Sequence, residues 1–216
     1  MNKVNQFTLG EEVANAITHG VGMVFSIVGL VFLIIFSALY GSAWHIVSFT
    51  IFGATMVFLY TSSTLLHSLP KGRAKDVFEI LDHSSIYFFI AGTYTPFLLV
   101  AVRGTLGWSL FGIVWAVAIG GTIFKVFFVK RFVLVSTILY VAMGWMIVLA
   151  WPMLTEQLAR GGILLLIIGG LFYTLGAIFY VWRLFKFHHM VWHIFVLTAT
   201  ILHYFTILIY VLPIDV

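Results

Sequence analysis

Hydrophobic residues run along this chain in long stretches that carry almost no charge, which is typical of membrane-spanning helices. No Asp, Glu, Lys or Arg occurs between Val13 and Pro70. That stretch is long enough for two spans of about 20 residues joined by a tight turn at Gly41. Five more such stretches follow: Ile80–Val102 with Asp82 as its single charge, Gly104–Phe124, Phe132–Thr155, Gly161–Trp182 and Met190–Ile214. The pattern predicts an all-α membrane protein, a bundle of seven transmembrane helices.

Composition supports this fold class. The 216 residues are 62% hydrophobic and only 8% charged, whereas soluble domains carry about 25% charged residues. Runs such as residues 164–168 (LLLII) do not alternate polar and apolar positions, which argues against a β-barrel. Glu11 and Glu12 stand where a signal peptide would be basic, so we expect no cleaved leader. We expect a short cytoplasmic arm, residues 1–12, and a single transmembrane domain, residues 13–216.

The distribution of positive charge predicts the orientation. Nine of the eleven Lys and Arg residues fall on the N-terminal side of the predicted membrane, and only Arg103 and Arg160 fall on the other side. By the positive-inside rule, the N-terminus is cytoplasmic and the C-terminus lies outside. The net charge of +4 is therefore explained by topology, and we expect lipids and no nucleic acid as partners. The absence of cysteine excludes disulfides and thiolate metal ligands.

Proline and glycine suggest local features of the helices. Pro70 and Gly72 end the second helix, and the basic stretch Lys71–Phe78 is expected to form a loop before a third helix that opens at Glu79. Pro96 predicts a kink in that helix. The fifth helix is expected to end near Trp151-Pro152. The glycine-rich segment Gly161–Trp182 favours close packing against a neighbouring helix.

Four ionisable side chains from three helices are expected at one depth in the membrane. His67 ends the second span, Asp82 begins the third, and His189 and His193 begin the seventh. Residues four apart share a helix face, so His189 and His193 form one pair of imidazoles, and Ser63 shares a face with His67. Ionisable groups inside a membrane are costly and usually serve a function.

Three neutral imidazoles are a good ligand set for zinc, with a fourth position open to water. We therefore predict His67, His189 and His193 as metal ligands. Asp82 and Ser63 are candidates for the fourth position or for supporting hydrogen bonds. An open zinc site lowers the pKa of water to about 7 and polarises carbonyl groups, which is hydrolase chemistry. Each residue also has a simpler interpretation: an interfacial His189, a hydrogen-bonded core His193, or Asp82 as a helix dipole partner.

The other histidines have weaker assignments. His83 and His188 are expected to face loops or headgroups, and His45 lies at the outer end. His19 is at the inner depth and is a candidate to line the same cavity. His203 is on the order of 20 Å deeper than His189, so we expect it to hydrogen-bond within the bundle.

Several of these motifs resemble the hemolysin III proteins of bacteria, which belong to the progestin and adipoQ receptor family together with the adiponectin receptors. The matching motifs are residues 11–20 (EEVANAITHG), Ser63-x3-His67, residues 81–84 (LDHS) and His189-x3-His193. The resemblance covers nearly the whole chain. It implies a seven-helix bundle, zinc on His67, His189 and His193, and Asp82 and Ser63 near the metal and its water. The chain lacks the long N-terminal region of the animal receptors, so receptor signalling is not implied.

Three functions are consistent with these residues. The first is a zinc-dependent intramembrane hydrolase of a lipid amide or ester, similar to the alkaline ceramidases, in the bacterial plasma (inner) membrane. Asp82 would act as a general base or orient the zinc-bound water, and Ser63 would give hydrogen-bond support. The second is a non-catalytic, zinc-stabilised protein that senses or tunes the state or energetics of the membrane. The third, a lytic pore, is disfavoured because a secreted pore-former must first be soluble.

Overall fold

The structure is a computed structural model that describes residues 7–183 and 185–216, and its regular structure consists of helices. No strand occurs in the described ranges. The helices are α1 (Leu9–Tyr40), α2 (Ala43–Ser68), α3 (Arg73–Pro96), α4 (Gly104–Phe128), α5 (Val133–Trp145), α6 (Trp151–Gln157), α7 (Arg160–Val181) and α8 (His188–Thr206). Shorter helical turns extend three of them: η1 (Phe97–Val102) after α3, η2 (Met146–Ala150) between α5 and α6, and η3 (Ile207–Val211) after α8.

Seven segments within the described residues are long and apolar enough to cross a membrane, which confirms the predicted bundle. The segment α5–η2–α6 forms a single span, Val133–Gln157. The predicted end of the fifth helix near Trp151-Pro152 is therefore wrong. Pro152 stands at the first turn of α6, where a missing backbone N–H costs no helical hydrogen bond, so the helix continues through it.

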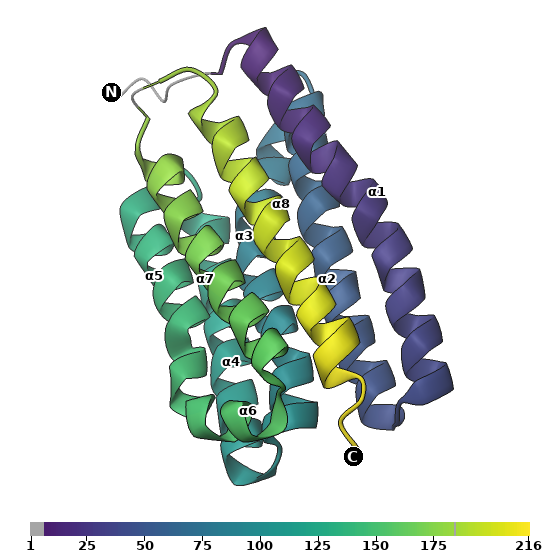
Figure 1. Cartoon of the computed structure of the whole chain (residues 1–216). Coiled ribbons are helices and arrows are strands. Elements are labelled where there is room, and N and C mark those ends of the chain that lie inside the picture. Colours follow the sequence, from purple (N-terminus) through teal and green to yellow (C-terminus); the bar gives the residue numbers. More distant parts are fainter. Residues whose placement is uncertain (1–6, 184) are drawn as a thin grey trace.

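The helices run side by side along one axis, with α3 at the centre and α1 at the edge (Figure 1). In the most apolar part of each span, 83% of residues are buried for α3 and only 28% for α1. α1 packs mainly on α2 and α8, and α7 packs mainly on α8. The start of α8 and the end of α2 consequently meet at the end of the bundle where α1 begins.

Two helices begin earlier than their charge patterns suggested. α1 begins at Leu9 because Thr8 and Glu11 form a capping box, so the last residues of the predicted arm are helical. α3 begins at Arg73 rather than Glu79. The predicted loop Lys71–Phe78 thus contributes its greater part to α3, whose start follows Gly72 at φ +157°.

Pro96 and the α7 glycines act as their positions suggested. α3 gives way to the π-helical turn η1 directly after Pro96, where the proline removes an intrahelical hydrogen bond. Along α7, Gly162 faces the ring of Tyr210, and Gly176 faces Trp192 and Phe195. A side chain at these positions would push α7 away from the span that contains α8, so the glycines permit close packing.

Replacing Gly176 by Ala should destabilise the bundle. A Cβ atom there would lie 2.8 Å from Cβ of Phe195 and 3.0 Å from the ring of Trp192, so α7 and α8 must separate. We expect a loss of about 1–3 kcal/mol, measured as a lower apparent Tm in detergent. Gly120→Ala in α4 is the matched control, because no atom lies within 4 Å of a Cβ built there. Equal melting of the two variants would contradict close packing at Gly176.

Candidate metal centre

Three histidines from two helices converge at the end of the bundle where α1 begins. His67 lies in the last turn of α2, and His189 and His193 lie in the first two turns of α8. One ring nitrogen of each lies within 4.8 Å of those of the other two. His67 and His193 are buried and His189 is half-buried. The structure therefore brings together the three residues predicted to be ligands, and this group could hold a metal ion.

The hydrogen bonds around His67 and His193 leave one nitrogen of each ring free to bind a metal. Nδ1 of His67 donates to Glu12 Oε2 at 2.6 Å, while its Nε2 is buried without a partner among the described residues. Nδ1 of His193 donates to the carbonyl oxygen of Asn15 at 3.3 Å. A ring that donates from Nδ1 and is neutral presents a lone pair at Nε2, which is the form that coordinates a metal.

The spacing of the donors is close to that of a shared zinc ion. Zinc–nitrogen bonds are about 2.0–2.1 Å long and the ion is tetrahedral, so two nitrogens on one ion lie about 3.4 Å apart. The separations here are at most 4.8 Å, and side-chain rotations that move the nitrogens together by up to about 1.4 Å would close them. The donor set, its neutral tautomers and the buried, unpaired Nε2 of His67 fit a zinc ion.

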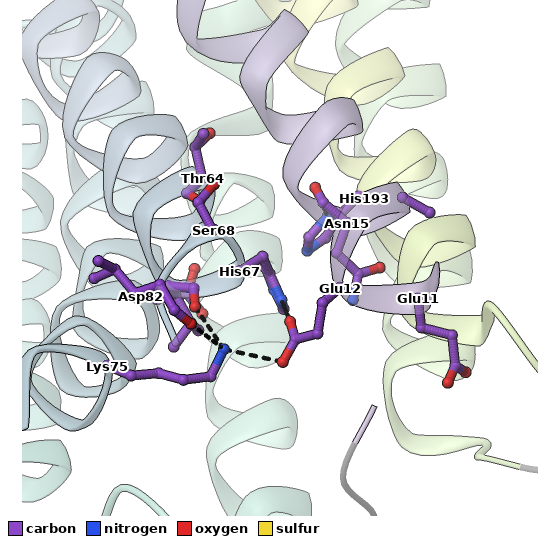
Figure 2. Close-up of polar contacts among 12 residues, drawn as sticks. Glu11, Glu12, Asn15, Thr64, His67, Ser68, Lys75, Asp82 and His193 are labelled. Carbon is purple, nitrogen blue, oxygen red and sulfur yellow. Dashed lines mark hydrogen bonds and ion pairs between the residues drawn. The ribbon is translucent and has the colours of Figure 1, made fainter. Parts of the chain in front are cut away.

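A charged pair from α1 and α3 holds His67 in place. The carboxylate of Glu12 accepts from His67 through one oxygen and from Lys75 Nζ through the other, at 2.9 Å (Figure 2). Lys75 also donates to the carbonyl oxygens of Leu66 and Leu69 at the end of α2. A carboxylate on the outer nitrogen of a ligand histidine fixes the tautomer and orientation of the ring.

Glu12 has no assigned role in the sequence analysis, although a signal for it was present. Its place in the first turn of α1 is that of an ordinary dipole partner. However, Glu12, Asn15 and His19 are spaced by three and four residues, so they share one face of α1. That face is turned toward the histidines. Figure 2 shows Glu12 and Asn15 on the site side, whereas Glu11 points away from His67.

His19 lies directly against the three histidines, as its depth suggested. Its ring stacks on His193 with centroids 3.4 Å apart and planes 13° from parallel. It lines the same cavity, and both of its nitrogens are buried without a partner in the described part of the chain. His19 therefore adds a fourth imidazole beside the site.

Asp82 and Ser63 occupy different surroundings near the site. Asp82 is 9% exposed, lines the cavity from α3, and has its Oδ2 at 3.6 Å from Nδ1 of His83. It is not among the donors that lie within 4.8 Å of one another. Ser63 is fully buried one turn along α2 from His67, and its Oγ has no partner among the described residues.

The remaining histidines are bound to the backbone. His203 Nε2 donates to the carbonyl oxygen of Leu166 at 3.1 Å, which confirms its predicted role within the bundle. His188 is buried, and its Nδ1 contacts the carbonyl oxygen of Phe179 at 3.3 Å, so its predicted exposure to loops or headgroups is wrong. His83 is half-buried, with Nδ1 donating to the carbonyl of Glu79. His45 lies at the far end, as expected, and is buried there.

A long, mainly apolar cavity begins at the histidines. Its volume is about 420 Å³, and it lies between α3, α5, α7 and α8. His19, Asp82, His189 and His193 line one end, and Phe97, Ile147 and Trp151 line the other. On α3 the lining extends from Asp82 to Phe97, a rise of roughly 22 Å. These polar groups therefore lie at one end of a mainly apolar cavity.

Comparisons with known proteins identify the family to which the chain belongs. A family model described as "Haemolysin-III related" matches residues 7–204. The chain belongs to the haemolysin III family. It is 56% identical to the Hemolysin-3 homolog of Bacillus subtilis (strain 168), over 94% of this chain and 96% of that protein. It is 50% identical to Hemolysin-3 of Bacillus cereus, over 99% and 97% of the two chains.

A more distant relative is the human monocyte to macrophage differentiation factor, which is 32% identical over 93% of this chain and 84% of that protein. No solved structure gives a significant match to the chain. The haemolysin III match spans all the residues of the site, from Glu12 to His193, so the site lies within the part of the chain that defines the family.

Replacing Glu12 by Gln should weaken metal binding without removing a ligand. The amide cannot accept as strongly from His67 and loses the ion pair with Lys75. We expect an affinity for zinc about 10–100-fold lower, measured by competition with a chromophoric chelator. Glu156→Gln, at an exposed position of α6 at the opposite end, is the control. Unchanged affinity in Glu12→Gln would show that the carboxylate does not position His67.

Proposed function

We propose that this haemolysin III protein is a zinc-dependent intramembrane hydrolase that acts on a lipid amide or ester. The observation that carries the proposal is a cluster of three imidazole donors of which two, His189 and His193, line one end of an apolar cavity inside the membrane-spanning bundle. A metal there would adjoin the carbonyl group of a lipid whose hydrocarbon chain fills the cavity. The substrate would be drawn from the membrane lipids.

His67, His189 and His193 would hold the ion, and Glu12 would keep His67 in its ligating tautomer. Zinc in such a site lowers the pKa of water and polarises a carbonyl oxygen. Its three protein ligands leave a fourth position for water or substrate. The remaining chemistry is proton transfer, which falls to side chains on the cavity wall.

Asp82 is suited to that proton transfer because it lines the cavity at the end that bears the histidines. Its carboxylate would take a proton from the attacking water as the new carbon–oxygen bond forms. It would return the proton to the amine or alcohol as the acyl carbon–nitrogen or carbon–oxygen bond breaks. The unpaired Oγ of Ser63 is a candidate hydrogen-bond support on the α2 side.

The cavity suggests the kind of substrate. An extended hydrocarbon chain advances about 1.25 Å per carbon, so a length of roughly 22 Å corresponds to about 16–18 carbons. The lining is mainly apolar and aromatic, which favours one long acyl chain over a polar substrate. The proposed orientation places the histidines in the cytoplasmic half of the bacterial inner membrane, because nine of eleven Lys and Arg residues lie at that end of the chain's spans.

A non-catalytic role is the second candidate, and one observation favours it. Glu12 and Lys75 connect the site to α1 and α3, while the histidines come from α2 and α8. A metal held there would bind four helices together, as structural zinc sites do. In that case the ion would stabilise a protein that senses or tunes the state of the membrane.

Lipid hydrolysis by the purified, zinc-loaded protein tests the first proposal. We expect turnover of long-chain lipid amides or esters, its loss in His67→Ala, and a rate about 10²–10⁴-fold lower in Asp82→Asn. Asp215→Asn, an exposed carboxylate near the C-terminus, should retain the full rate. The measurement is release of free fatty acid from a panel of defined lipids.

Removal of zinc separates the two candidates when stability and hydrolysis are measured on the same sample. Loss of turnover with chelator, restored by added zinc, supports the hydrolase. A lower apparent Tm with chelator, with no zinc-dependent turnover on any lipid class, would support the structural role and refute the hydrolase.

Filling the deep part of the cavity should change the preferred chain length. Gly144 lines the cavity near the end of α5, and no atom lies within 4 Å of a Cβ built there. Gly144→Leu should therefore occupy empty space and lower turnover of substrates with about 16–18 carbons relative to shorter ones. Gly112→Leu in α4, another open position that does not line the cavity, is the control. An unchanged chain-length profile would show that the acyl chain lies elsewhere.

A further inference from the structure

A second group of polar side chains lies on the other side of α3, away from the histidines. Its central member is Lys125, three residues before the end of α4. The residue is fully buried, and its Nζ has no hydrogen-bond partner among the described residues. A buried, unpaired ammonium group is strongly destabilising unless an anion compensates it. Ionisable residues within membrane spans therefore indicate a function.

Three hydroxyl groups share this condition and lie along the same contact between α3 and α4. Three atoms are buried without a hydrogen bond of ordinary geometry in the described ranges: Oγ of Ser84, Oη of Tyr87 and Oγ1 of Thr122. The hydroxyl of Tyr87 also faces the side chain of Ser136. The ring of Tyr87 covers Gly121, where a built Cβ would lie 2.5–2.6 Å from the ring atoms. Because α3 and α4 are antiparallel neighbours, Ser84 on α3 then lies level with Lys125 on α4.

The carboxylates near this contact between α3 and α4 form ion pairs with another cation. Lys130 Nζ lies 3.0 Å from Asp76 Oδ1 and 3.2 Å from Glu79 Oε2. Neither carboxylate is bonded to Lys125. The unpaired groups at the contact between α3 and α4 are an ammonium and three hydroxyls, and each of them can donate a hydrogen bond. A set of donors that includes a positive charge matches the oxygens of an anion such as phosphate.

We propose that Lys125, Ser84, Tyr87 and Thr122 bind the phosphate group of an anionic lipid. Lys125 lies about 4.5 Å along the axis from the last residue of α4, close to the basic end of this span. Lys130 and Arg131 follow at the same end and attract anionic lipid. On the outer face of α4, the exposed side chains of Ile123, Val126 and Phe127 offer contact for the acyl chains.

Access to this site requires a local movement, because Lys125 is covered in this structure. A headgroup would enter if the flexible lysine side chain rotated, or if α4 moved away from α5. These two helices make few contacts with each other. Bound water would satisfy the hydroxyl groups but would bring no counter-charge to Lys125, which the carboxylate of Glu79 attracts without bonding to it. The site lies between α3 and α4 and uses none of the proposed metal ligands, so it does not depend on the proposed hydrolase.

Thermal unfolding of the full chain in detergent tests the site with three additives: phosphatidylglycerol, phosphatidylcholine and inorganic phosphate. We expect phosphatidylglycerol to raise the apparent Tm more than the other two additives. Lys125→Met keeps the length of the side chain and removes the charge, so it should abolish this selective rise. Without added lipid it should be at least as stable as the wild type, because it removes an unpaired buried charge.

Lys186→Met is the matched control, since Lys186 is exposed in the connection before α8. It should keep the phosphatidylglycerol response. If Lys125→Met cannot be purified, Thr122→Val should reduce the response by weakening the affinity for phosphatidylglycerol about tenfold. An equal response to both lipids, or a response retained in Lys125→Met, would overturn the proposal. If inorganic phosphate raised the apparent Tm as much as phosphatidylglycerol does, the ligand would be a free anion and not a lipid.

Discussion

The meeting of the end of α2 with the start of α8 is the contact on which the proposed chemistry depends. Neither helix can bring three imidazoles together alone. His67 is directed by a carboxylate from α1, and that carboxylate is held by an amine from α3. The histidine donors therefore converge only when four helices are correctly packed. A partly buried charged network of this kind contributes little to stability by itself, which is consistent with retention for binding.

The cavity and the histidines complement each other physically. A bilayer-embedded protein must satisfy its polar groups internally, and in this bundle the histidines adjoin a mainly apolar cavity of about 420 Å³. An empty chamber forfeits packing contacts, so its presence is costly unless a ligand fills it. A hydrocarbon chain is the ligand that such a lining would accept from the surrounding membrane.

Much of this architecture could be predicted from the sequence because the membrane imposes simple rules. Charge-free runs located all seven spans, and helical spacing placed His189 and His193 on one face. The depth of His67, inferred from the boundary of its span, was sufficient to associate it with the pair on α8. The boundaries that were wrong, at Arg73 and around Pro152, are places where charged or proline-containing turns continue a helix beyond its apolar part.

Contacts between distant segments could not be predicted in the same way. The pairing of Glu12 with His67 spans 55 residues and follows from α1 lying on α2. The burial of His188 follows from its contact with the end of α7. Periodicity shows which residues share a helix face, but it does not show which helix that face meets.

The buried polar groups without partners are concentrated toward one end of the bundle, and this asymmetry unites the two proposed sites. One set of these groups lies at the candidate metal centre, on α1 and α2: Asn15, His19, Ser63 and His67. The Lys125 group lies between α3 and α4 at the same end. Among the described residues, only His203 carries such an atom deeper in the bundle. Since unpaired polar groups in a membrane interior are costly, their concentration indicates that ligands are bound at this end. At the opposite end, the described side chains include no buried polar atom without a partner.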